Sequence, residues 1–131
     1  MKPIFPKLEK YYSEKWKNKK RDVSIALVNI MLYKMNKGSF IDLGCGFGSY
    51  MSILREFGRK GKGFVATVYE AKACKAKGLD VDVADLNKKI NVSDGSFDNA
   101  ICIDVIEHIK NNKVFMGEVY RILKKGGKLL I

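Results

Sequence analysis

Residues 40–48 read Phe-Ile-Asp-Leu-Gly-Cys-Gly-Phe-Gly, an apolar run that ends in an acid and leads into three glycines at alternate positions. The stretch 39–43 is too short for a helix and rich in β-forming residues, whereas 49–57 carries apolar residues at helical spacing. The sequence therefore predicts a strand, a glycine turn and a helix. Such a turn lets a ligand approach bare backbone and presents the positive end of a helix to a negative group. This arrangement is typical of a site for a nucleotide-like cofactor.

The spacing inside the glycine turn separates two classes of cofactor. The dinucleotide fingerprint Gly-x-Gly-x-x-Gly needs its third glycine one place after Gly48, where this chain has Ser49. An acid two residues before the first glycine, as Asp42 is before Gly44, resembles the first motif of class I S-adenosylmethionine-dependent methyltransferases. A glycine turn that merely connects a strand to a helix is the alternative.

Further blocks resemble the type 11, small-molecule members of that family. Residues 94–108 read Asp-Gly-Ser-Phe-Asp-Asn-Ala-Ile-Cys-Ile-Asp-Val-Ile-Glu-His, similar to the family's Asp-x-Ser-Phe-Asp block with its later Glu-His. Residues 121–127 read Arg-Ile-Leu-Lys-Lys-Gly-Gly, similar to the closing Arg-x-Leu-Lys-Pro-Gly-Gly with Lys125 in place of proline. The resemblance covers about residues 39–131. It implies an α/β, Rossmann-like fold with a five-stranded parallel sheet in the order 3-2-1-4-5, flanked by helices.

The resemblance also implies S-adenosylmethionine as the cofactor and in-line methyl transfer to a small-molecule acceptor as the activity. It places the glycine loop around the methionine end through backbone amides, with Asp42 orienting the loop or the ammonium group. Asp85 would accept from the adenine amino group, Leu86 would pack on the ring, and Ile103 would contact the adenosyl-methionine linkage. The implied cofactor-binding residues are Asp42, Gly44, Cys45, Gly46, Gly48, Val65, Asp85, Leu86 and Ile103.

Val65 departs from the family pattern. The family ends its second strand with an Asp or Glu that takes both ribose hydroxyls, and counting without gaps from Gly44 places Val65 there. The loss of two charge-assisted hydrogen bonds costs ~3 kcal/mol. Glu70 either contacts the ribose from the next helix or, as we favour, only places a negative charge favourably near the amino terminus of that helix. This departure motivates an alternative function, a degenerate, non-catalytic domain for binding or assembly.

The cluster Asp104-x-x-Glu107-His108 has three interpretations. Asp104 and Glu107 have the spacing of a capping box at a helix start, which is the interpretation we favour. His108, the one histidine of the chain, is the candidate catalytic residue, as a general base that deprotonates the acceptor. A divalent ion held by the three residues is the third interpretation, and we predict no metal.

The composition indicates one α/β domain of 131 residues, with an N-terminal helical segment over 1–37 and a cofactor-binding core over 38–131. Residues 23–35 are almost continuously apolar and predict a core helix capped by Asp22. No stretch approaches the ~20 apolar residues that span a bilayer, and no signal peptide is recognisable. We therefore expect a cytoplasmic protein with no membrane partner. The three cysteines are odd in number and far apart, which predicts neither a disulfide nor a metal site.

The net charge of +11 introduces a third functional class. Residues 15–21 form a basic run next to Tyr11, Tyr12 and Trp16, a pattern with which an RNA methyltransferase could bind phosphates and stack bases. A solvated helix face is the interpretation we favour. The family resemblance implies another role, in which Tyr11 and Tyr12 close over the sulfonium. The chain has neither the Pro-Pro motif of amino-directed nucleic-acid methyltransferases nor a Pro-Cys nucleophile.

The carboxy-terminal residues 127–131 predict the fifth strand. The antiparallel pair that finishes the sheet in the family would lie beyond it, so we expect either a truncated chain or a homodimer that pairs through this exposed apolar strand.

Overall fold

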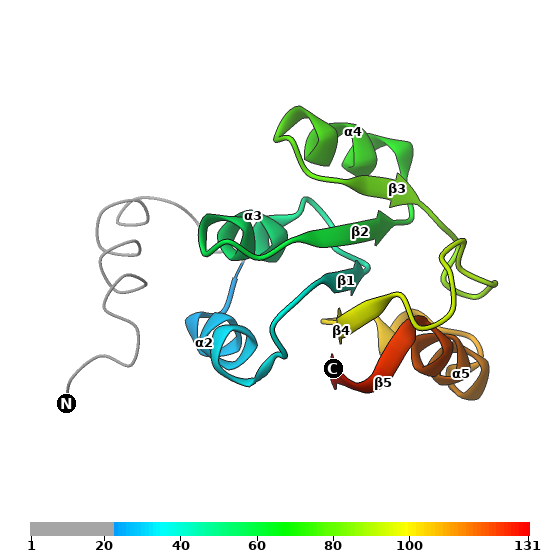
Figure 1. Ribbon diagram of the computed structural model, residues 1–131. Helices are drawn as coiled ribbons and strands as arrows, with labels where there is room; N and C mark the ends of the chain where they lie inside the picture. The colour runs from blue at the N-terminus through cyan, green and yellow to red at the C-terminus, as the bar shows by residue number, and fades with distance from the viewer. Residues whose placement is uncertain (1–22) are drawn as a thin grey trace.

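The computed structural model describes residues 23–131, which form one parallel sheet with helices on both faces (Figure 1). The strands are β1 (Phe40–Leu43), β2 (Gly61–Val65), β3 (Val81–Val83), β4 (Phe97–Ile101) and β5 (Leu123–Leu130). All pair in parallel in the order β3-β2-β1-β4-β5. The expected fold class and strand order are confirmed.

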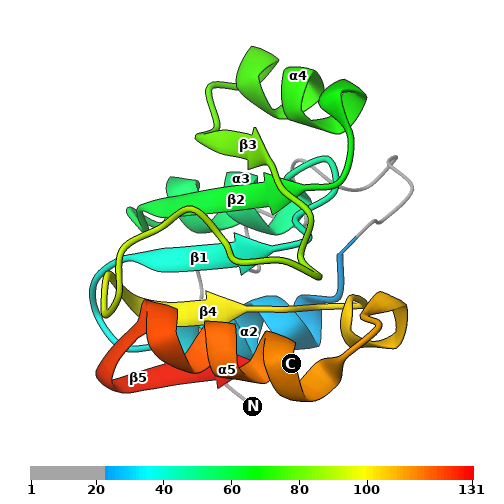
Figure 2. The same cartoon turned by 90° about the vertical axis from the view of Figure 1, so that its right-hand side faces the viewer.

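The helices cover the two faces of the sheet unequally, as Figure 2 shows. They are α2 (Ile25–Lys34), α3 (Ser49–Glu56), α4 (Val68–Ala76), the short 3-10 helix η1 (Ile106–His108) and α5 (Asn112–Ile122). Helices α2, α3 and α4 pack with Phe40 on one face, whereas α5 packs with Ile41 and Leu43 on the other. Alternate residues of a strand point to opposite faces, so the β1 residue Asp42 lies on the face of Phe40.

Side-chain caps fix where the helices begin. Ser24 caps α2 by accepting from Leu27 N, while Asp22, the expected cap, lies outside the described residues. At α4 the Thr67 hydroxyl accepts from Glu70 N at 3.2 Å and donates to Glu70 Oε2 at 2.7 Å. This reciprocal pair is a capping box. The favoured placement of Glu70 near a helix amino terminus is therefore confirmed.

The fifth strand begins earlier than expected. Leu123 pairs with Phe97, and after a register shift Lys128 pairs with Asn99. Gly126, with φ 77°, lies in the irregular stretch between the two pairings. No further strand pairs with the outer edge of β5 among residues 23–131, and the homodimer through this edge stays a prediction. Within the same residues, no helix is long and apolar enough to cross a membrane.

Candidate functional site

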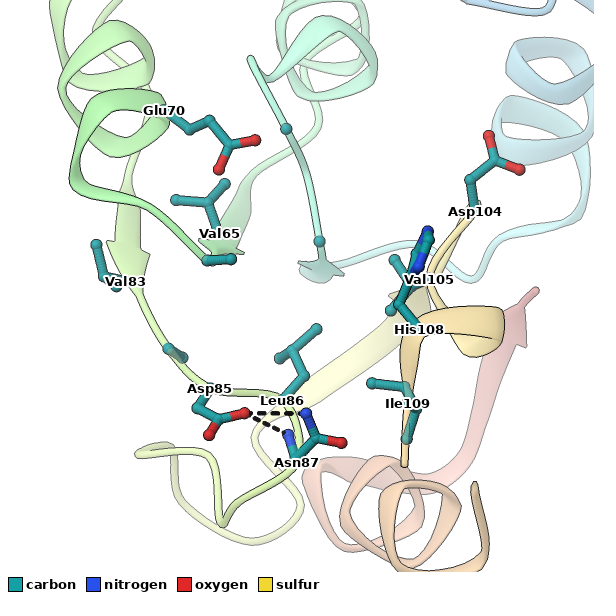
Figure 3. Close-up of a pocket in the computed structure, with 14 residues that line it drawn as sticks. Val65, Glu70, Val83, Asp85, Leu86, Asn87, Asp104, Val105, His108 and Ile109 are labelled. Carbon is teal, nitrogen blue, oxygen red and sulfur yellow. Dashed lines mark hydrogen bonds between the residues drawn. The ribbon is translucent and has the colours of Figure 1, made fainter. Parts of the chain in front are cut away.

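A cleft of about 530 Å³ lies at the carboxyl ends of β1, β2 and β3 (Figure 3). Ligands of open parallel sheets bind at this edge, where the strand order reverses. The cleft brings together six of the residues expected from the sequence. They are Gly44, Gly46, Val65, Asp85, Leu86 and His108.

The glycine loop that joins β1 to α3 has a left-handed backbone at all three glycines. Their φ angles are 83° at Gly44, 55° at Gly46 and 77° at Gly48, in a region that costs other residues about 1–2 kcal/mol. A Cβ at Gly44 would overlap Val105 Cγ2, whereas at Gly46 it would meet no protein atom within 4 Å. Gly44 is therefore needed for packing, and Gly46 leaves space open at the cleft.

The hydrogen bonds of this loop occupy three of the four amides in the expected cradle, which stays a prediction. Gly44 N and Cys45 N both donate to Phe64 O, at 2.9 and 3.0 Å, and Gly48 N donates to Cys45 O at 2.9 Å. An amide has one proton, so these three donors hold the loop together and are not free for a ligand. Gly48 also leaves the first turn of α3 without a side-chain cap. Donors for an anionic group therefore remain at the start of α3.

Asp42 is the third residue of β1 and lies two residues before Gly44, the first residue of the glycine loop. Its side chain is buried, with 3% of the residue exposed. Its carboxylate forms no hydrogen bond or ion pair with residues 23–131 that the structure describes, and its oxygens keep a small contact with solvent. Burial raises its pKa to about 7. A buried carboxylate without a partner, next to a ligand loop, fits a bound cation such as an ammonium group.

Cys45, Gly48 and Ile103 do not line the cleft, although the family resemblance implies contacts for them. The Cys45 side chain is half-buried, and burial followed by the nearby Asp42 carboxylate raises the pKa of its thiol. A Cβ at Gly48 would overlap Leu79 Cδ1, so this glycine packs against α4 and its following turn. Ile103 packs against the core cluster below the site. Their roles as cofactor contacts stay predictions.

The turn after β3 contains a residue that the sequence reasoning missed. Asp85 Oδ1 accepts from Asn87 N at 2.9 Å and from Asn87 Nδ2 at 3.2 Å, drawn as dashed lines in Figure 3. These bonds lower the pKa of the Asp85 carboxyl. Asn87 Oδ1 in turn accepts from Lys110 N at 2.8 Å, which ties this turn to the loop before α5. An Asp side chain that accepts from the backbone amide two residues later forms an Asx turn, and the Asp-x-Asn spacing in the sequence could have indicated it.

Val65 and Glu70 lie together on one side of the cleft. Val65 ends β2 and is 2% exposed, so its side chain belongs to the core as well as to the cleft wall. Figure 3 shows the Glu70 carboxylate beside Val65 and turned toward the open space. Glu70 therefore caps α4 and lines the cleft at once.

The expected capping box at Asp104 and Glu107 is wrong. Helix η1 has Val105 at its N-cap position and no side-chain cap. Asp104 has φ 55°, a left-handed conformation that turns the chain before the helix begins. His108 is exposed, and its Nε2 lies 3.9 Å from Glu107 Oε1. No group of three His, Cys, Asp or Glu side chains that could hold a metal occurs in residues 23–131.

The charge of the cleft is opposite to that of the whole chain. Glu70, Asp85 and Asp104 line it, and the described lining contains no lysine or arginine, although the chain carries 25 of them. Glu70 and Asp104 lie on opposite sides of the open space in Figure 3. Val83, Val105 and Ile109 add apolar wall. The arrangement suits a ligand that is cationic and partly apolar.

Comparison with known proteins gives matches in sequence and in fold. A family model described as a methyltransferase domain matches residues 41–131. The chain is 30% identical over 101 residues to norajmaline N-methyltransferase of Rauvolfia serpentina, covering 71% of this chain and 35% of that protein. It is 32% identical over 98 residues to a sterol 4-C-methyltransferase of Caenorhabditis elegans, covering 70% and 29%. The chain thus spans about a third of the length of these relatives.

Solved structures share the fold. An S-adenosylmethionine-dependent methyltransferase of Mesorhizobium loti superimposes with a TM-score of 0.67 at 23% identity, covering 76% of this chain and 48% of that chain. At this identity the likeness concerns the fold alone.

Proposed function

Because the chain belongs to the methyltransferase domain family, we propose that its cleft binds S-adenosylmethionine and supports methyl transfer to a small-molecule acceptor. The observation that carries this proposal is an acidic cleft beside a glycine loop in a strongly basic chain. S-adenosylmethionine has a cationic sulfur and a cationic ammonium group, and carboxylates around the cleft favour both. The unpartnered Asp42 carboxylate is a further match for a cation.

The remaining groups of the cofactor also have candidate partners. The Asp85 carboxylate retains Oδ2 as an acceptor for the adenine amino group, because Asn87 donates to Oδ1. Leu86 and Ile109 provide apolar surface for the ring. Glu70 is the described carboxylate next to Val65, so we assign to it the ribose contact that Val65 cannot make.

The bound cofactor would supply an electrophilic methyl group, whose bond to sulfur breaks as an acceptor lone pair bonds to carbon. Alignment of the two reactants accounts for ~7–11 kcal/mol of the barrier in favourable cases. The walls of the cleft provide this alignment, and His108 at its rim takes the acceptor proton. The names of two relatives specify small acceptors, norajmaline and a sterol, which supports an acceptor of that class.

Calorimetric titration with S-adenosylmethionine and, separately, S-adenosylhomocysteine tests the proposal. We expect micromolar, one-site binding of both, followed by transfer of labelled methyl to small amines or hydroxyls in an acceptor screen. If the Val65→Asp variant bound S-adenosylmethionine and the natural chain did not, the proposed methyl transfer would be overturned. The alternative of a degenerate, non-catalytic domain would then be favoured. Labelling of RNA but of no small molecule would overturn the acceptor class.

A further inference from the structure

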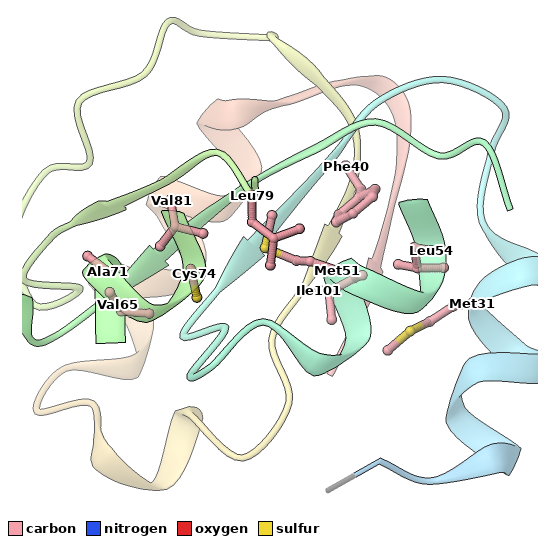
Figure 4. Close-up of a cluster of buried hydrophobic side chains, with 10 residues drawn as sticks. All are labelled: Met31, Phe40, Met51, Leu54, Val65, Ala71, Cys74, Leu79, Val81 and Ile101. Atoms are coloured by element: carbon pink, nitrogen blue, oxygen red, sulfur yellow. The ribbon is translucent and has the colours of Figure 1, made fainter. Parts of the chain in front are cut away.

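A second pocket opens at the amino ends of the same three strands, at the edge opposite the cleft. Its volume is about 330 Å³, and none of its described lining residues is shared with the cleft. Phe40, Met51 and Leu79 form an apolar floor, and Figure 4 shows these buried side chains close together. A Cβ at Gly61 would overlap the Phe40 ring, so glycine at this position lets the floor pack against β2.

Three cations surround this floor. Arg55 lies in the last turn of α3, and Arg59 and Lys60 lie in the turn before β2. Asp80 is the one carboxylate in the described lining, and its Oδ1 is paired with Lys62 Nζ at 3.0 Å. The pocket is therefore positive, in contrast to the acidic cleft at the other edge.

Both guanidinium groups are held in place by backbone carbonyls. Arg55 Nη1 donates to Lys77 O at 2.7 Å, and Arg59 Nη2 donates to Asn36 O at 2.7 Å. Asn36 is itself fixed by the fully buried Asn99, whose Oδ1 accepts from Asn36 N at 2.7 Å. An arginine has five N–H donors in a rigid plane, so one anchoring bond orients the remaining donors.

Arg59 also carries an unsatisfied donor. Its Nε is buried and has no hydrogen-bond partner among the described residues. Leaving a buried donor unpaired costs about 1–3 kcal/mol, so the chain holds Arg59 in this position at a cost in stability. From the three cations around an apolar floor and the two anchored guanidinium groups, we propose that the pocket binds the phosphate group of a nucleotide or of RNA. Planar guanidinium groups match phosphate oxygens in pairs.

This site is separate from the proposed methyl-transfer site, because it lies at the other edge of the sheet and shares none of its described lining residues with the cleft. Two ligands could supply the phosphate group, a free nucleotide and an RNA chain. A site of this kind would let the domain hold an anionic ligand while the cleft is occupied.

Titration with inorganic pyrophosphate, AMP and a short single-stranded RNA tests the proposal, using the full chain with and without S-adenosylmethionine. Arg55→Gln and Lys60→Gln should each weaken pyrophosphate binding about three- to fivefold, as expected for exposed charges. Arg59→Gln should weaken it about tenfold, because it removes a guanidinium group that Asn36 O holds in place at the pocket. The control is Lys113→Gln on α5, which removes the same charge away from the pocket and should change nothing.

Arg59→Gln also breaks the bond to Asn36, so the other two variants keep the test valid if that variant fails to fold. Tighter binding of AMP than of RNA identifies a free nucleotide as the source, and the reverse identifies RNA. The proposal is overturned if pyrophosphate does not bind at millimolar concentration. It is also overturned if Arg55→Gln and Lys60→Gln weaken binding no more than Lys113→Gln.

Discussion

The carboxyl edge and the amino edge belong to the same sheet, yet their charges are opposite. At the carboxyl edge, Glu70, Asp85 and Asp104 surround a glycine loop. At the amino edge, Arg55, Arg59 and Lys60 surround an apolar floor. A net charge of +11 predicts neither. The difference teaches that the two edges of one sheet in this small domain present surfaces of opposite charge.

The largest expected effect concerns Asp42, the buried acid behind the carboxyl edge. Its pKa is raised from 3.8 to about 7, so the folded chain keeps a proton that the unfolded chain loses. Stability should therefore fall as the pH rises from about 4 to about 7, by about 4 kcal/mol in all from this group. Asp42→Asn should remove that part of the pH dependence.

Urea unfolding of both proteins at several pH values measures this effect, because the difference between them isolates Asp42. A difference that stays constant between pH 4 and pH 7 would show that burial does not hold the proton on this carboxyl.

The next effect separates two glycines of the same loop. Gly44→Ala combines left-handed strain with overlap against Val105 and should destabilise the fold by about 3 kcal/mol. Gly46→Ala has open space around its new methyl group and should cost only about 1 kcal/mol. It should nevertheless weaken S-adenosylmethionine binding, because the methyl group enters the cleft. Denaturation and calorimetry on both variants check this, and equal stability losses would contradict the packing role of Gly44.

The smallest effects test the charge contrast itself. Glu70→Gln should weaken the binding of S-adenosylmethionine and of S-adenosylhomocysteine about threefold each, because both carry the ribose that we assign to Glu70. Asp80→Asn neutralises an acid at the amino edge, so it is the matched control. It should leave cofactor binding unchanged and strengthen pyrophosphate binding about twofold. If both variants changed S-adenosylmethionine binding equally, the cleft charge would not select the cofactor.

The sequence was most informative where function depends on consecutive residues. The glycine turn after an apolar strand predicted the position of the cleft, and the family resemblance implied the strand order that the structure confirms. Asp85 and Leu86 line the cleft, since both lie in the turn that follows β3.

Features that depend on conformation or on distant residues could not be predicted in this way. The spacing of Asp104 and Glu107 satisfies a capping box, but the left-handed backbone at Asp104 prevents it, whereas Thr67 and Glu70 form one. The amides of Gly44 and Cys45 are used because Phe64 O, some twenty residues away, accepts from both. The pocket at the amino edge is lined by residues from four separate segments of the sequence, so no short sequence motif indicates it.

The central claim is that one sheet carries two sites of opposite charge at its two edges. Amide proton–nitrogen correlation spectra of the labelled chain, titrated with S-adenosylmethionine and then with pyrophosphate, test it most directly. We predict that S-adenosylmethionine shifts the amides of Gly46, Leu86 and Asn87, and that pyrophosphate shifts those of Lys60 and Gly61. Shifts by both ligands at the same edge, or by S-adenosylmethionine at neither, would contradict the account.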